Sequence, residues 1–153
     1  MRRQEKSIHD PDALRDLLRR GQVCRLGLVD RDRAYIVPMN YGYADNCLYF
    51  HSAREGKKVE LLKTGGHVCF EVDLDHALQP GERGCSWTMH FQSVIGYGRV
   101  SFLETEAEKR AGLGVIMAQY APGSHWEFSE SDMKRVLVFK LTIEEMSGKA
   151  SKE

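Results

Sequence analysis

The sequence has no net charge and no long apolar segment. Its 153 residues include 22 lysines and arginines against 22 aspartates and glutamates. Such a balance gives no overall attraction to nucleic acid or to an anionic membrane surface. No apolar run approaches the length of a membrane span, and no apolar segment follows the charged N-terminal residues. We therefore expect no nucleic acid and no membrane among its partners, and a cytoplasmic location.

Cysteine is sparse and irregularly spaced. Cys24, Cys47, Cys69 and Cys85 form no Cys-x-x-Cys pair, so they do not predict a zinc site. The first three lie in apolar, strand-like stretches, where a reduced thiol behaves as a small hydrophobic group. We expect buried free thiols rather than a disulfide framework. The six histidines have no acidic residues at ligand spacing, so we expect no metal site.

Length and composition predict one globular domain. A chain of 153 residues can bury a sizeable core, and 42% hydrophobic with 29% charged residues is ordinary for a soluble protein. We expect a single domain over residues 1–153, with the segments 1–7 and 148–153 flexible.

Short strand patterns joined by turns dominate the chain. Alternating or continuous apolar residues predict six strands, at 23–29, 35–43, 47–52, 67–73, 92–103 and 136–143. The stretch 74–84 contains proline and glycine and is interpreted as a long loop. Short turns between the strands favour a mainly β fold with a few helices, specifically a six-stranded antiparallel barrel.

Capping residues indicate three helices. Asp10, Pro11 and Gly21 bracket a helix with an apolar stripe of leucines. A second, short helix is predicted at 56–62. The third begins with a capping box at 105–108.

A proline inside an apolar strand is the first feature typical of a ligand site. Pro38 lies in the predicted strand 35–43, and because proline has no N–H it does not fit an ordinary central strand. An edge strand, a bulge or a bound ligand would each explain it. We expect the flat, apolar part of a ligand to lie against this strand.

A hydroxyl group and two lysines follow the next strand. Ser52 ends the predicted strand 47–52, and Lys57 and Lys58 begin the helix after it. A helix start with these groups suits a phosphate. Lysine pairs are also commonly solvated on a helix surface, so both interpretations stay open at this point.

Several stretches, in order and at suitable spacing, resemble the pyridoxamine phosphate oxidase-like flavoproteins. The resemblance covers residues 8–148. It rests on VCRLGL at 23–28, YIVPMNYGY at 35–43, LYFHSA at 48–53, GKK at 56–58 and CFEV at 69–72. CSWTM at 85–89 and SVIGYG at 93–98 are similar to the nitroimidazole-resistance, nitroreductase-like subgroup.

This resemblance implies a split β-barrel homodimer that binds FMN at each of two subunit interfaces. It implies an FMN-dependent oxidoreductase that takes electrons from a small-molecule donor and reduces a small acceptor such as a nitroaromatic or nitroimidazole. The implied cofactor contacts are Pro38, Met39, Asn40 and Tyr41 beside the ring, His51 and Ser52 near the ring or ribityl chain, Lys57 and Lys58 at the phosphate, and Trp87, Thr88 and Phe91 or Gln92 from the other side of the site.

His51 is the implied catalytic residue. An imidazole can accept or deliver a proton near neutral pH. The alternative is a strand-end histidine that donates one hydrogen bond to a loop carbonyl.

The chain also departs from the pyridoxamine phosphate oxidases proper. Those enzymes hold the flavin with an arginine and a lysine at the two ends of the first site strand, where this sequence has Tyr35 or Ile36 and Asn40. Oxidation of vitamin B6 is therefore disfavoured. Two other classes stay open, a haem-binding split-barrel protein and a flavin-binding protein without catalysis.

Overall fold

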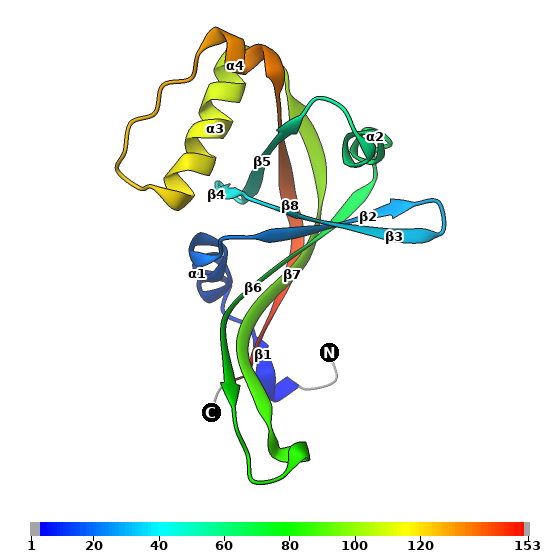
Figure 1. Ribbon diagram of the computed structural model, residues 1–153, viewed down its shortest axis with the longest axis vertical. Coiled ribbons are helices and arrows are strands. Elements are labelled where there is room, and N and C mark those ends of the chain that lie inside the picture. Colours follow the sequence, from blue (N-terminus) through cyan, green and yellow to red (C-terminus); the bar gives the residue numbers. More distant parts are fainter. Residues whose placement is uncertain (1–3, 152–153) are drawn as a thin grey trace.

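One antiparallel sheet runs through the computed structural model, which describes residues 4–151 (Figure 1). Its strands are β1 (Ser7–Ile8), β2 (Cys24–Asp30), β3 (Arg33–Met39), β4 (Gly42–Ala44), β5 (Cys47–Ala53), β6 (His67–Gln79), β7 (Thr88–Leu103) and β8 (Val136–Ser151). The order is β3-β2-β6-β7-β8-β5-β4, and β1 pairs with β8.

The two edges of this sheet meet in the sequence. Edge strands β3 and β4 are separated only by Asn40 and Tyr41. Three Cα–Cα steps span at most about 11 Å, so the sheet must curl until its edges approach each other at this point. The result is an open, split barrel, which confirms the mainly β class with helices. The described strands number eight rather than the six predicted.

The predicted strand 35–43 is two strands. Residues of β3 pair with β2 over its whole length, from Asp30 opposite Arg33 to Cys24 opposite Met39. Only β4 forms the expected hairpin with β5. The turn consists of Asp45 and Asn46, both with positive φ (49° and 57°), as a two-residue hairpin turn requires.

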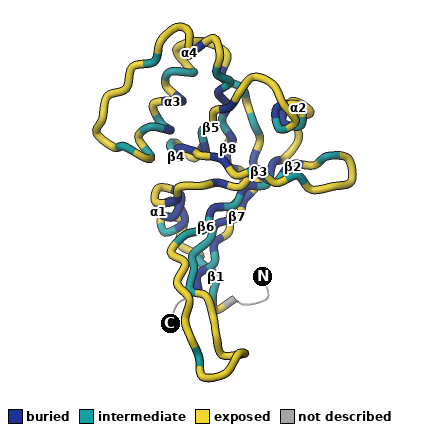
Figure 2. The backbone as a smooth tube through the Cα atoms, viewed as in Figure 1, coloured by how far each residue is buried: buried dark blue, intermediate teal, exposed yellow. Residues whose placement is uncertain are grey.

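The predicted loop 74–84 is largely strand. β6 continues to Gln79 and pairs with β7 as far as Gln79 opposite Thr88, with a β-bulge between Leu74 and Ala77. The 3₁₀ turn Gly84–Ser86 lies at the tip. We call this extension, residues 74–92, the arm. Figures 1 and 2 show that it extends away from the rest of the molecule, with exposed residues along most of it. Because both its faces are largely exposed, the sequence lacks the alternation that predicts a strand.

The predicted flexible C-terminal segment is also ordered where it is described. β8 continues to Ser151, with Lys149 opposite Ser7 of β1 and Ser151 opposite Phe91 of β7. Gly148 to Ser151 therefore belong to the sheet. Residues 1–3 and 152–153 of the predicted flexible segments lie outside the described residues.

Four α-helices accompany the sheet, α1 (Pro11–Arg20), α2 (Lys57–Lys63), α3 (Glu106–Tyr120) and α4 (Glu130–Arg135). The first begins as predicted, with the Asp10 side chain accepting a hydrogen bond from the backbone N–H of Asp12 at 3.0 Å. The capping box at the start of α3 is confirmed as well. The sequence analysis missed α4, although Ser129 and Asp132 form a capping box at its start.

Two hydrophobic clusters occupy opposite faces of the β5–β8 pair. The main core includes Phe50 and Phe139, whose rings stack at 5.2 Å. The second cluster lies under α3 and α4 and includes Leu113, Met133 and Val138. Helices α3 and α4 thus form a layer over the outer face of β5 (Figure 1).

The cysteines match the sequence prediction of free thiols. All four thiols are free, with Cys24 and Cys47 buried, Cys69 half-buried and Cys85 exposed. Burial strongly raises the pKa of the Cys24 thiol. Within residues 4–151, no cluster of metal-ligating side chains is present, and no helix is long and apolar enough to cross a membrane.

Gly96 should tolerate no side chain. A Cβ there would lie 2.5 Å from two atoms of the Phe70 ring and against the Glu145 carbonyl oxygen. We expect Gly96→Ala to lower the free energy of unfolding by about 1–3 kcal/mol, the usual cost of overpacking. Urea unfolding followed by circular dichroism measures this change.

Gly114 provides the matched control. It lies exposed within α3, and a Cβ there would meet nothing within 4 Å. Gly114→Ala should raise stability by up to about 1 kcal/mol, because alanine favours the helix. Equal effects of the two substitutions would contradict the close packing at Gly96.

Candidate functional site

The edge strand β3 presents one face to the core and the other to solvent. Met39 points inward and is only 7% exposed. Ile36, Pro38 and Asn40 are exposed on the alternate positions. Pro38 lies on an edge strand, one of the three explanations that the sequence allowed. Of the residues predicted beside a flavin ring, Pro38 and Asn40 are therefore the accessible ones.

Tyr41 belongs to the core of this chain. Its side chain is fully buried, and its hydroxyl donates a hydrogen bond of 2.6 Å to the carbonyl oxygen of Leu18. Its backbone N–H donates to the hydroxyl of Tyr120 at 2.9 Å. These contacts fasten the crossing between β3 and β4 to α1 and α3, and they leave no exposed side-chain surface for a ligand.

The two lysines at the start of α2 have different surroundings. Lys57 Nζ lies 2.6 Å from the Asp30 carboxylate and 4.8 Å from the centre of the Tyr35 ring. That ion pair lowers the pKa of Asp30. Lys58 is half-buried and has no hydrogen bond or ion pair within residues 4–151. Lys58 is thus free for an anion, whereas Lys57 must share its charge with Asp30.

Strand alternation sends His51 and Ser52 to opposite faces of β5. Ser52 points inward, is 9% exposed, and donates a hydrogen bond of 2.7 Å to the carbonyl oxygen of Ala53. His51 points outward, toward the helical layer. Burial first, and the positive charge of Lys58 second, lower the pKa of His51. Its imidazole is therefore neutral near pH 7 and available to accept or donate a proton.

A shallow hollow of about 390 Å³ lies beside His51. Its apolar wall consists of Leu113 from α3, Phe128 from the segment before α4, and Val136 at the start of β8. Arg135 at the end of α4 also lines it. The sequence analysis missed this hollow, because its residues are far apart in the chain and α4 was not predicted.

The other predicted contacts lie on the arm. Trp87 and Thr88 are exposed near its tip, at the far end of the molecule from α2 and β5 in Figure 1. Gln92 lies farther along β7 and donates a hydrogen bond of 2.6 Å to the Asp75 carboxylate. One chain therefore does not bring these residues together with His51 and the lysines.

Three exposed apolar side chains lie on the outer side of the sheet, beside the charged residues Arg25, Glu71 and Glu145. Ile36 is 64%, Ile95 46% and Tyr97 44% exposed. Strand register places Ile36 opposite Gly27, Gly27 opposite Cys69, and Cys69 opposite Tyr97, so these residues form one row across four strands. We call this surface, with Ile95 included, the outer sheet face.

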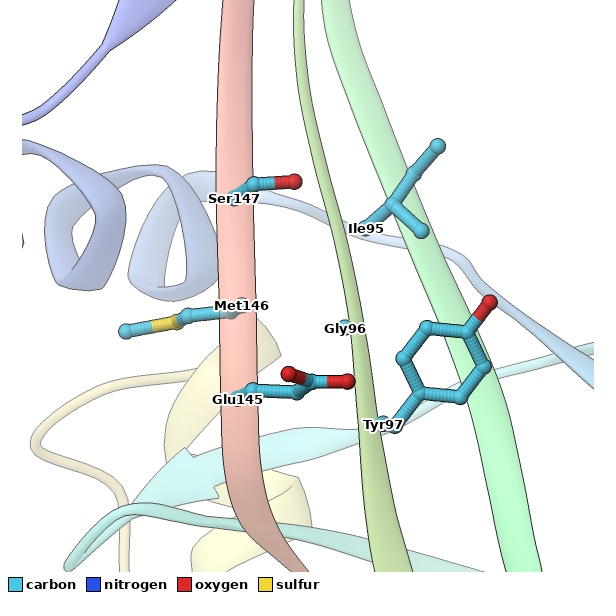
Figure 3. Close-up of a pocket in the computed structure, with 6 residues that line it drawn as sticks. All are labelled: Ile95, Gly96, Tyr97, Glu145, Met146 and Ser147. Atoms are coloured by element: carbon cyan, nitrogen blue, oxygen red, sulfur yellow. The ribbon is translucent and has the colours of Figure 1, made fainter. Parts of the chain in front are cut away.

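A small hollow of about 200 Å³ opens on this face between β7 and β8, away from His51 (Figure 3). Figure 3 shows Ile95 and Tyr97 on either side of Gly96 along β7, with Glu145, Met146 and Ser147 of β8 beside them. Apart from the Glu145 carboxylate and the Tyr97 hydroxyl it offers few reactive groups. Apolar surfaces of this kind are typical of interfaces.

The open antiparallel barrel with its helical layer defines a split-barrel protein. A family model described as pyridoxamine 5'-phosphate oxidase matches residues 10–150, and the chain belongs to that family. A search of curated proteins finds no match.

Among solved structures, a candidate 5-nitroimidazole antibiotic resistance protein of Bacteroides thetaiotaomicron is 32% identical, with a TM-score of 0.83. The match covers 95% of this chain and 90% of that one. The flavocytochrome Anf3 of Azotobacter vinelandii has a TM-score of 0.87 at 19% identity, covering 100% of this chain and 72% of that one. The FAD and haem binding protein of Mycobacterium smegmatis has a TM-score of 0.87 at 18% identity, covering 97% and 74%. These last two share the fold.

Lys58→Gln should raise the pKa of His51. Removing the positive charge favours the imidazolium, although burial will still hold the value below its ordinary one. NMR titration of the histidine ring protons measures the change. Lys57→Gln is the control, because that charge is paired with Asp30 and does not act on His51. An equal pKa of His51 in wild type and Lys58→Gln would contradict the effect of the Lys58 charge on this imidazole.

The same pKa shift predicts a change in stability with pH. Since the folded state binds the His51 proton less readily than the unfolded chain, this residue favours folding above pH about 6.5. Its contribution is lost as the pH falls below that value toward the lowered pKa. Lys58→Gln should weaken this dependence, as measured by urea unfolding at pH 5 and pH 8.

Proposed function

We propose that this protein is an FMN-dependent oxidoreductase that reduces a small organic acceptor of the nitroaromatic or nitroimidazole kind. One observation carries the proposal, the 32% identity over 95% of the chain to a candidate 5-nitroimidazole antibiotic resistance protein. Family membership over residues 10–150 supports flavin as the cofactor.

The residues present fit FMN. Lys58 is a half-buried cation without a carboxylate partner among the described residues, and a phosphate would neutralise it. Pro38 and Asn40 offer an exposed edge-strand surface for a flat ring system. Lys57 can also contribute to the phosphate site, although its charge is partly neutralised by Asp30.

FMN would supply the electron transfer, from a small-molecule donor to the acceptor. The protein would supply the anchor, the position and a group that accepts a proton. Lys58 would hold the phosphate end by charge-assisted hydrogen bonds. His51, neutral near pH 7, would accept a proton at its unprotonated ring nitrogen.

A second copy of the chain would complete the site. Trp87 and Thr88 are exposed where β7 begins, and this end of the arm lies far from β5 in Figure 1. The outer sheet face presents exposed Ile36, Ile95 and Tyr97. A homodimer would bury this face and bring the arm of one copy to the lysines of the other. Burying three such side chains contributes about 1.5–3 kcal/mol each when the burial is complete.

The cofactor can be identified from the absorbance spectrum of the purified protein, before and after addition of FMN and desalting. Retained bands of oxidised flavin support the proposal. A Soret band would instead indicate a haem-binding protein. Bound flavin that no reductant reduces productively would indicate a flavin-binding protein without catalysis.

Lys57→Ala combined with Lys58→Ala should raise the Kd for FMN at least tenfold. Each charge-assisted hydrogen bond is worth about 1.5–3 kcal/mol, and about 1.4 kcal/mol is a factor of ten. Riboflavin, which has no phosphate, should bind wild type and variant equally, as measured by flavin fluorescence quenching. Lys63→Ala, at the other end of α2, is the matched control and should change neither Kd. FMN affinity that survives the double substitution removes the phosphate assignment.

A further inference from the structure

The hollow beside His51 has at its rim a cation that forms no hydrogen bond or ion pair among the described residues. Arg135 is exposed and has no hydrogen bond or ion pair with any residue from 4 to 151. Six arginines of residues 4–151 form ion pairs with carboxylates, namely Arg15, Arg20, Arg25, Arg33, Arg99 and Arg110, whereas Arg19, Arg31, Arg54 and Arg83, like Arg135, do not.

Asp132 is the acidic residue that lines the hollow, and it is committed elsewhere. Its carboxylate accepts hydrogen bonds from the backbone N–H of Ser129 at 2.9 Å and from the Ser129 hydroxyl at 2.7 Å. These bonds, with a smaller contribution from the charge of Arg135, lower the pKa of Asp132. The carboxylate thus caps α4 and forms no ion pair with the guanidinium at the other end of that short helix.

The remaining surfaces of the hollow select the shape of a ligand. Leu113 is buried and Phe128 and Val136 are half-buried, and together they form an apolar wall in the hollow that Arg135 also lines. A volume of about 390 Å³ falls in the range of about 300–1,000 Å³ for small-molecule sites. An apolar wall beside one unpaired cation suits a single aromatic ring that carries an acidic group.

We propose that this hollow binds small aromatic carboxylates, with the carboxylate on Arg135 and the ring against Leu113, Phe128 and Val136. The ring then lies next to His51. The role of this ligand as the electron acceptor rests on the proposed function. If the ligand is the acceptor, the natural acceptors are acidic aromatic compounds. Binding itself requires no flavin.

Arginine is suited to this task. Its planar guanidinium can donate two parallel hydrogen bonds to a carboxylate, and it remains charged at every physiological pH. The charge of Lys58 acts on His51, which lines the hollow, and it therefore adds to the positive potential there. A neutral ligand of the same shape gains nothing from either charge.

The test compares 4-nitrobenzoate with the neutral 4-nitrobenzyl alcohol. Binding to the purified full chain is measured by NMR titration without any electron donor. Wild type should bind the carboxylate at least tenfold more tightly than the alcohol. Arg135→Gln should reduce this preference to twofold or less by weakening the carboxylate alone.

Lys134→Gln is the matched control. It removes one charge from the adjacent position, but Lys134 does not line the hollow, so the preference should be unchanged. Ala53→Phe tests the location, because Ala53 is exposed at the edge of the hollow and a phenyl ring there would fill it. This variant should weaken both ligands at least tenfold.

A preference that persists in Arg135→Gln, unchanged affinities in Ala53→Phe, or no preference in wild type would each overturn the inference. Because no turnover is measured, these outcomes are independent of the redox proposal. Selective binding of the carboxylate in a protein that retains no flavin would support the proposed binding site in the hollow and refute the proposed oxidoreductase function.

Discussion

The pairing of β5 with β8 is the constraint on which the candidate site depends. It runs without a register shift from Cys47 opposite Thr142 to Ala53 opposite Val136, and both faces of the pair are covered by hydrophobic clusters. Because side chains alternate along a strand, a slip of one residue would exchange the two faces. Burial of Phe50 in the main core therefore fixes His51 on the outer face, beside α3 and α4.

Charge distribution distinguishes the residues that a ligand can use from those that the fold has already used. Lys57 serves the contact between α2 and the β2–β3 hairpin through Asp30. Lys58 and Arg135 have no such partner among residues 4–151. Both act on groups near them, Lys58 on His51 and Arg135 on Asp132. Two positive charges without an ion-pair partner among residues 4–151 thus lie near one histidine.

The sequence predicted elements whose signals are local. The cap at Asp10, the capping box at Thr105 and the alternation of Val68, Phe70 and Val72 each depend on residues close together in the chain, and each is present in the structure. The edge position of Pro38 is one of the three explanations that the chemistry of proline allowed. Family membership was likewise accessible from short motifs in order.

Features that depend on distant residues escaped prediction. The arm mixes polar and apolar residues on both faces, and the end of β8 has only the small residues Gly148 and Ala150 between its polar ones, so only their pairing with β7 shows them to be strands. Tyr41 was predicted to contact a ligand, but its side chain is buried and its hydroxyl donates a hydrogen bond to the carbonyl oxygen of Leu18. The hollow beside His51 combines β5, α3 and α4, and no window of sequence contains all three.

The bulge in β6 also controls how the arm behaves toward other molecules. Between Leu74 and Gln79 this strand has β7 as its only strand partner within the described residues, and a long free edge invites pairing with a neighbouring molecule. Asp75 interrupts that edge with a φ of 57° and is held by Arg20 and Gln92. A buckled, charged edge is a poor template for a further strand. The bulge and its charged residue therefore protect the free edge of β6 against pairing with a further strand.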